Sequence, residues 1–459
     1  MKLVKYKYEI HIVSHTHWDR EWYSTNEEFN IRLYNMFNKL LNILSTTRDY
    51  KYFVLDGQTS LLEDYIALCP QNKDKLKTFI KSGRIIIGPW YVQSDEFLVS
   101  GESLIRNLLM GYMICEDFEG KPMKIGYLPD QFGHISQMPQ ILNGFGIKTA
   151  IFSRGVSRVA EKLGSEFWWK APDGSKVLAI YQVGGYGNAA ALGYISPDTT
   201  GNTKYPVNFE KALTQTKELV KMLSKYANTR YLLFNNGVDH YEPQQELPEI
   251  IKYLNKNLKG IKVLHSNFEL FIKKVKSAKV NFKEYIGEMR SSYYTFLLSN
   301  VLSTRIYLKQ KHTIVENLLQ KYTEPLVTFS WLEGASYPKE LLLRAWKYLL
   351  LCHPHDSICG CSNDRVIKDV FNRLEKVEEI CTVLINNSYE YLTRKINTSF
   401  LTSTDDKDRI IPVVVFNTLP WVRTELVTVE VIYSLNETDN NEEFVVIDPE
   451  KNNSLGAVY

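Results

Sequence analysis

The feature that most constrains the fold is a regular alternation, over residues 1–280, of short apolar runs with longer amphipathic stretches. The apolar runs are typical of strands, whereas stretches such as Phe29–Leu44, Glu102–Cys115 and Phe209–Tyr226 have helical spacing. Repeated strand–helix units predict an α/β fold with a parallel sheet or a barrel. The expected strands are Glu9–Ser14, Lys51–Leu55, Arg84–Pro89, Met123–Leu128, Thr149–Ser153, Lys176–Tyr181, Arg230–Phe234 and Lys262–His265.

Polar segments follow several of these strands. They are HTHWDREWY (residues 15–23), GYLPDQFGH (126–134), SRG (153–155) and NNGVDHYEP (235–243). In parallel sheets and in barrels, functional sites form at the carboxyl ends of the strands. The placement of these segments therefore predicts that they share one site.

The pattern changes after residue 280. Helical spacing dominates to about residue 397, and two strand-like runs flank Leu419-Pro420-Trp421 beyond it. Two or three strands do not make a stable sandwich, so the last part is expected to be the incomplete start of one. The predicted helices are Leu302–Tyr322, Pro338–Leu351 and Asp364–Lys395, the late strands are Ile410–Phe416 and Glu425–Tyr433, and the predicted domains are 1–280, 281–398 and 399–459.

Composition excludes some classes of function. The net charge of +3, from 55 Lys and Arg against 52 Asp and Glu, gives no reason to expect nucleic acid or an anionic membrane as a partner. No apolar run is long enough for a secretion signal or a membrane span. The six cysteines are scattered and do not resemble a disulfide framework, so a reducing, cytoplasmic location is expected.

Two histidine-containing segments could hold a metal ion. His17 and Asp19 are alternate residues of an extended segment and can point the same way, and imidazole plus carboxylate suits a borderline divalent ion such as zinc. The alternative is that His17 lies on the surface and that Asp19 caps the next helix. His355, in the segment HPHD, could supply a ligand from a second domain, or could belong to an ordinary helix end. The nearby cysteines 352, 359 and 361 lack the spacing of a paired zinc motif.

The remaining candidates are polar residues at strand ends. Asp130 could be a nucleophile, a metal ligand or a turn former. Asp239 also follows an apolar strand, and it could either take part in the chemistry of the site or only form a turn. Asp95 could contact substrate or cap a helix, and Arg154 could clamp a carboxylate or a sugar hydroxyl, or form a surface ion pair.

Taken together, these segments resemble glycoside hydrolase family 38, in its bacterial branch. HTHWDREWY, VLDGQTSLLEDY, GYLPDQFGHISQMPQIL, FSRG and HPHDSICGCS occur in the family's order, over residues 8–420. The resemblance implies an irregular β/α barrel of about seven strands, then a helical bundle, then β-rich domains. It also implies a retaining exo-α-mannosidase that forms a covalent mannosyl-enzyme and uses one divalent ion, zinc or alternatively cobalt, manganese or calcium, to bind mannose hydroxyls.

The resemblance assigns roles to individual residues. The metal ligands are His17, Asp19, Asp130 and His355. Asp130 also matches the nucleophile and Asp239 the general acid/base, for which a separation of roughly 5–5.5 Å is expected. Substrate contacts are assigned to Trp22, Arg154 and Asp356, with Asp95 as a further candidate.

Other functions fit the same residues. A mannosylglycerate hydrolase of the same family would use the same centre on another aglycone. A metal-dependent carbohydrate deacetylase would use a metal-bound water in place of Asp130 as the nucleophile. A truncated, inactive sugar-binding fragment is a third alternative, because family members are much longer. The expected partners are an α-mannoside or oligosaccharide, with a homodimer and a separate chain carrying the C-terminal β-domains left open.

Overall fold

A computed structural model describes residues 6–399, 401, 410–430, 446–448 and 453–455. It divides into two compact units, one made of residues 1–316 and 346–377 and the other of residues 317–345 and 378–459. The units divide the chain differently from the predicted domains, because helices α12 (Lys339–Leu350) and α14 (Asp364–Thr393) each contribute to both. The predicted domain boundaries therefore stay a prediction.

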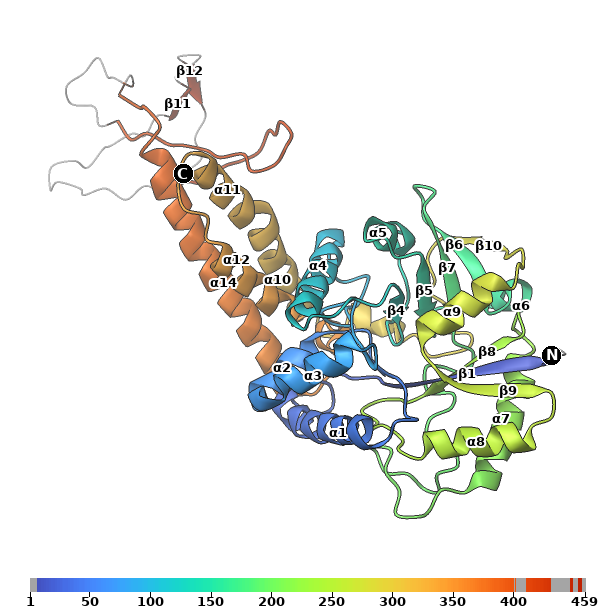
Figure 1. Ribbon diagram of the computed structural model, residues 1–459. Helices are drawn as coiled ribbons and strands as arrows, with labels where there is room; N and C mark the ends of the chain where they lie inside the picture. The colour runs from blue at the N-terminus through green and yellow to red at the C-terminus, as the bar shows by residue number, and fades with distance from the viewer. Residues whose placement is uncertain (1–5, 400, 402–409, 431–445, 449–452, 456–459) are drawn as a thin grey trace. The chain divides into compact units, whose positions relative to one another are not determined.

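The larger unit contains two five-stranded sheets (Figure 1). In the first sheet the order is β3-β2-β1-β8, with β9 also paired to β1, and every pair is parallel. The strand β1 lies between β8 and β9 and is buried along nearly its whole length, although its sequence, YEIHIVSHT, mixes apolar with polar residues. The strands are β1 (Tyr8–Thr16), β2 (Phe53–Leu55), β3 (Ile85–Ile86), β8 (Tyr231–Asn236) and β9 (Ile261–Ser266).

The second sheet has the order β10-β6-β7-β5-β4 and is parallel except for the antiparallel pair β6–β7. The strand β6 was not predicted from the sequence. Side chains of both sheets, among them Val13, Ile151 and Leu233, pack into one apolar core. The strands are β4 (Gly126–Leu128), β5 (Thr149–Phe152), β6 (Glu166–Lys170), β7 (Lys176–Tyr181) and β10 (Glu284–Ile286).

Helices connect the strands of this unit. The first, α1, begins with a capping box in which the Thr25 hydroxyl accepts from the Glu28 amide and the Glu28 carboxylate accepts from the Thr25 amide. The α/β class with parallel strands is confirmed, and closure into a barrel stays a prediction. The helices are α1 (Asn26–Thr46), α2 (Ser60–Leu68), α3 (Lys73–Lys81), α4 (Gly101–Asp117), α5 (Met138–Gly144), α6 (Val159–Leu163), α7 (Phe209–Leu223), α8 (Leu247–Asn257), α9 (Phe268–Ser277), α10 (Ile306–Asn317) and α13 (His355–Cys359).

The smaller unit contains α11 (Glu324–Leu332), parts of α12 and α14, and the antiparallel pair of β11 (Val446–Asp448) and β12 (Asn453–Leu455). Residues 410–430 are described without a regular strand. Much of the expected β-sandwich, including the end of the predicted strand Glu425–Tyr433, lies outside the described residues. None of the helices in the described part of the chain has the length and apolar character needed to cross a membrane.

Candidate active site

The site begins where β1 and β8 end side by side. Their pairing continues past both strands as a parallel bridge between His17 and Asp239, in which the His240 amide donates to the His17 carbonyl at 2.8 Å. A Cβ atom on Gly237 would lie 1.8 Å from the His15 carbonyl oxygen, so only glycine allows the two backbones to approach this closely. The predicted metal ligand and the predicted acid/base are thereby placed next to each other.

The four predicted metal ligands converge. His17 Nε2 lies 3.0 Å from Asp19 Oδ1 and 3.9 Å from Asp130 Oδ2. His355 Nε2, from the start of α13, lies 3.3 Å and 3.4 Å from the same two oxygens. All four side chains are buried. Four residues from three distant parts of the sequence therefore surround one point in the larger unit.

The ligand atoms are free to bind an ion. His17 Nε2, His355 Nε2 and Asp19 Oδ1 are buried and make no hydrogen bond of acceptable geometry within the described part of the chain. The opposite nitrogens are occupied, because His17 Nδ1 donates to Asp56 Oδ1 at 3.1 Å and His355 Nδ1 donates to the Gln93 carbonyl at 3.0 Å. Such outer contacts fix the tautomer that presents a bare Nε2 to a metal. The residues present thus fit a divalent cation.

The electrostatics favour positive charge at the same point. Burial alone would lower the pKa of His17, but the carboxylates of Asp56 and Asp19 outweigh it and hold this pKa well above the usual value. Burial is likewise outweighed at Asp19, whose pKa is held well below the usual range by His17 and His355. The cluster is therefore stabilised either by protons on the imidazoles or by a cation in their place.

Asp130 is held in its ionised form. The Arg154 side chain contacts Asp130 Oδ1 through Nε at 2.5 Å and through a second guanidinium nitrogen, while Oδ2 faces the two histidines. Burial would raise the pKa of Asp130, but His355 and Arg154 outweigh it and lower the pKa. The structure thus brings the predicted arginine onto the predicted nucleophile.

Asp239 is perturbed in the opposite direction. Burial raises its pKa, and the neighbouring carboxylates of Asp19 and Asp130 add to this effect against the opposing influence of His17. Its Oδ1 accepts a hydrogen bond of 2.8 Å from the hydroxyl of Tyr186, a residue that the sequence did not single out. The Tyr186 ring also lies 5.0 Å from the ring of His17.

The other residues that were predicted to contact substrate are Asp356, Asp95 and Trp22, and each has a different environment. Burial and neighbouring carboxylates raise the pKa of Asp356 to about 7, and its Oδ1 accepts from the Cys361 thiol at 3.0 Å. The carboxylate of Asp95 is engaged locally, because Oδ1 accepts from the amides of residues 97 and 98 at 2.8 Å. Trp22 is half-buried in the loop after β1. The roles of these residues toward a substrate stay predictions.

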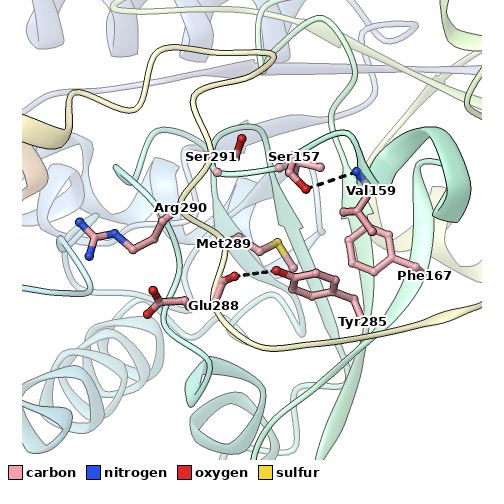
Figure 2. Close-up of a pocket in the computed structure, with 10 residues that line it drawn as sticks. Ser157, Val159, Phe167, Tyr285, Glu288, Met289, Arg290 and Ser291 are labelled. Carbon is pink, nitrogen blue, oxygen red and sulfur yellow. Dashed lines mark hydrogen bonds between the residues drawn. The ribbon is translucent and has the colours of Figure 1, made fainter.

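The larger unit also contains a second buried group of potential metal ligands and a separate cavity. His312, Glu316 and His353 also form a buried group of potential ligands, but the two imidazoles share a hydrogen bond of 2.8 Å between their Nε2 atoms. Neither Nδ1 atom of that pair has an acceptor among the described residues, so the outer contacts that orient a metal ligand are missing there. Elsewhere in this unit, a cavity of about 250 Å³ is lined by residues that include Met289 and Arg290, and none of its lining residues is a predicted metal ligand (Figure 2).

Comparison with known proteins identifies the class. Residues 7–292 match the family model of the glycosyl hydrolases family 38 N-terminal domain, and residues 297–392 match the alpha mannosidase middle domain. The chain therefore belongs to glycosyl hydrolase family 38, which confirms the resemblance found in its motifs.

Individual relatives agree with this class. The chain is 35% identical over 425 residues to a protein named "Putative mannosylglycerate hydrolase" from Halalkalibacterium halodurans, covering 90% of this chain and 45% of that one. It is 25% identical over 427 residues to alpha-mannosidase 2C1 of Mus musculus, covering 92% and 37%. The crystal structure of an alpha-mannosidase from Enterococcus faecalis matches with a TM-score of 0.79 and 33% identity, over 86% of this chain and 44% of that chain. The chain thus spans less than half the length of these relatives.

Proposed function

We propose that this chain carries the catalytic centre of a retaining exo-α-mannosidase with one divalent ion held by His17, Asp19, Asp130 and His355. One observation supports this most directly: ligand atoms from three distant segments face one another, and three of these atoms, His17 Nε2, Asp19 Oδ1 and His355 Nε2, are buried without hydrogen-bond partners among the described residues. A mixed set of two imidazoles and two carboxylates suits zinc, with cobalt, manganese and calcium as alternatives. The bound ion would supply a grip on two hydroxyls of the terminal mannose.

The protein groups would divide the chemistry between them. Asp130, kept ionised by Arg154, attacks the anomeric carbon while Asp239 gives its proton to the departing oxygen, so that the glycosidic bond breaks and a mannosyl ester forms. Asp239 then takes a proton from water, which attacks the same carbon and releases Asp130 with retained configuration. Tyr186 holds Asp239 in place throughout, and Trp22 packs against the sugar.

The substrate class is a terminal α-mannoside. Mannosylglycerate is the second candidate substrate, supported by the 35% identity to the relative named "Putative mannosylglycerate hydrolase".

The matches at 7–292 and 297–392 support a catalytic barrel domain followed by a helical middle domain. All six cysteines are free, which supports a reducing, cytoplasmic location.

Hydrolysis of an aryl α-mannoside, with and without a chelator, tests the proposal. We expect activity that is lost with the chelator, lost in Asp130→Ala, and retained in Asp117→Ala, an exposed aspartate at the end of α4. A fluorinated mannosyl donor should leave a covalent adduct on Asp130. Acetate release from an acetylated sugar without an adduct would instead indicate a deacetylase, and mannose binding without hydrolysis would indicate a sugar-binding fragment.

A further inference from the structure

A buried carboxylate in the loop after β1 connects two segments that carry metal ligands. Glu21 lies two residues after Asp19, and only 1% of its surface is exposed. Its Oε1 accepts a hydrogen bond of 2.7 Å from the hydroxyl of Ser357 and also contacts the guanidinium of Arg373 on α14. The partners are 336 and 352 residues away in the sequence, so this is a contact of the folded larger unit.

The position of this contact relates it to the metal centre. Ser357 follows His355 by two residues in α13, just as Glu21 follows Asp19 by two residues. A path of chain and one hydrogen bond therefore joins the two ligands, from Asp19 to Glu21, across to Ser357, and on to His355. The side chains of the two ligands also meet directly, because His355 Nε2 and Asp19 Oδ1 lie 3.3 Å apart. The contact of Glu21 with Ser357 thus lies two residues from each of these ligands.

Stability alone does not explain this arrangement. Glu21 Oε2 and Arg373 Nε are buried without hydrogen-bond partners in the part of the chain that the structure describes. Two charges buried with incomplete hydrogen bonding lose much of the attraction between them to desolvation, and apolar side chains of similar size often stabilise a fold as well or better. A pair of this kind is best explained by what it positions.

We propose that Glu21, through Ser357 and Arg373, is a positioning residue that sets His355 opposite His17 and Asp19. The inference rests on the proposed metal centre. Glu21 touches neither the ion nor the sugar; it acts by fixing where the first turn of α13 meets the loop after β1. Outer contacts of this kind typically change metal affinity by about 10- to 100-fold.

Cobalt binding to the 459-residue chain tests this role. Dissociation constants come from competition with a chelator, and the visible absorption of bound cobalt reports the ligand geometry independently of activity. In Glu21→Gln and Ser357→Ala we expect affinity to fall by about 10-fold or more, with an altered cobalt spectrum. The double variant Glu63→Gln/Lys347→Met removes another long-range ion pair and should bind cobalt as the wild type does.

The double variant Glu21→Leu/Arg373→Met separates positioning from stability, because it removes both buried charges together. We expect it to keep a wild-type melting temperature and still bind cobalt weakly, with the altered spectrum. Wild-type affinity and spectrum in this variant would overturn the positioning role while leaving the metal centre intact. If the wild type itself binds no cobalt, the proposed metal centre fails, and the positioning role fails with it.

Discussion

Replacing Asp56 by asparagine should weaken metal binding without removing a metal ligand. Asp56 is fully buried, and its carboxylate accepts from three donors: His17 Nδ1 at 3.1 Å, the Trp18 amide at 2.9 Å and Gln58 Nε2 at 2.6 Å. An asparagine has one acceptor oxygen where the carboxylate has two. Its amide group must therefore face either the His17 ring or the other two donors.

Each orientation has a cost that the structure defines. If the amide faces His17, the ring must carry its proton on Nε2, and the lone pair that would bind the ion is lost. If the oxygen faces His17, two N–H groups meet the new amide in a buried site, which costs about 1–3 kcal/mol for each unsatisfied group. We expect metal affinity to fall by about 10- to 100-fold, or about 1.4–2.8 kcal/mol.

Competition between the protein and a chelator of known zinc affinity measures this change. Asp49→Asn makes the same chemical replacement at an exposed ion pair and should leave zinc affinity unchanged. Wild-type zinc affinity in Asp56→Asn, with the protein still folded, would refute the reasoning that Asp56 fixes the tautomer of His17.

Three further predictions follow from the same geometry. Gly237→Ala should destabilise the fold by at least about 2 kcal/mol in urea titrations, because its Cβ would lie 1.8 Å from a carbonyl oxygen of β1, whereas Gly144→Ala meets nothing within 4 Å and should be neutral. Arg154→Met should move the acidic limb of the pH profile of kcat/KM to higher pH, because the lost guanidinium no longer lowers the pKa of Asp130. Burial lowers the pKa of His11 from 6.5 to about 4, so the unfolded chain takes up this proton first as pH falls. That contribution to stability is complete above pH 6.5 and is lost progressively toward pH 4, by about 3 kcal/mol, and urea unfolding of the wild type and His11→Gln across this range measures it.

Several strands could be predicted because apolar residues cluster in short runs between polar or helical segments. The runs at Glu9–Ser14 and Lys176–Tyr181 became β1 and β7 with small shifts of their ends. The strand Glu166–Lys170 was missed because it is short and has a charged residue at each end. A signal did exist, since Pro172-Asp173-Gly174 is a strong turn sequence, and it joins β6 and β7 into the antiparallel hairpin.

The candidate site divides in the same way. His17, Asp19, Asp130 and His355 could be proposed as metal ligands because they lie in three recognisable motifs. Asp56 and Gln93 could not, because they act on the far nitrogens of the histidines and their role exists only once the chain is folded. The Gly-rich sequence around Tyr186 gives no hint that its hydroxyl reaches Asp239. Asp56 also lies in a recognisable motif, VLDGQTSLLEDY, but only the tertiary contact shows that its carboxylate orients the ring of His17.

The assignment of Asp130 and Asp239 depends on their surroundings and not on their residue type. Both are buried aspartates near the same histidines, and burial raises the pKa of each. At Asp130 the Arg154 guanidinium and His355 reverse this effect, so the carboxylate stays negative and can attack a carbon. At Asp239 burial raises the pKa, and the carboxylates of Asp19 and Asp130 add to this effect against the opposing influence of His17, which favours the protonated form that a general acid requires. Opposite pKa shifts of this kind are what a nucleophile and a general acid require, and at Asp130 His355 and Arg154 together produce the downward shift.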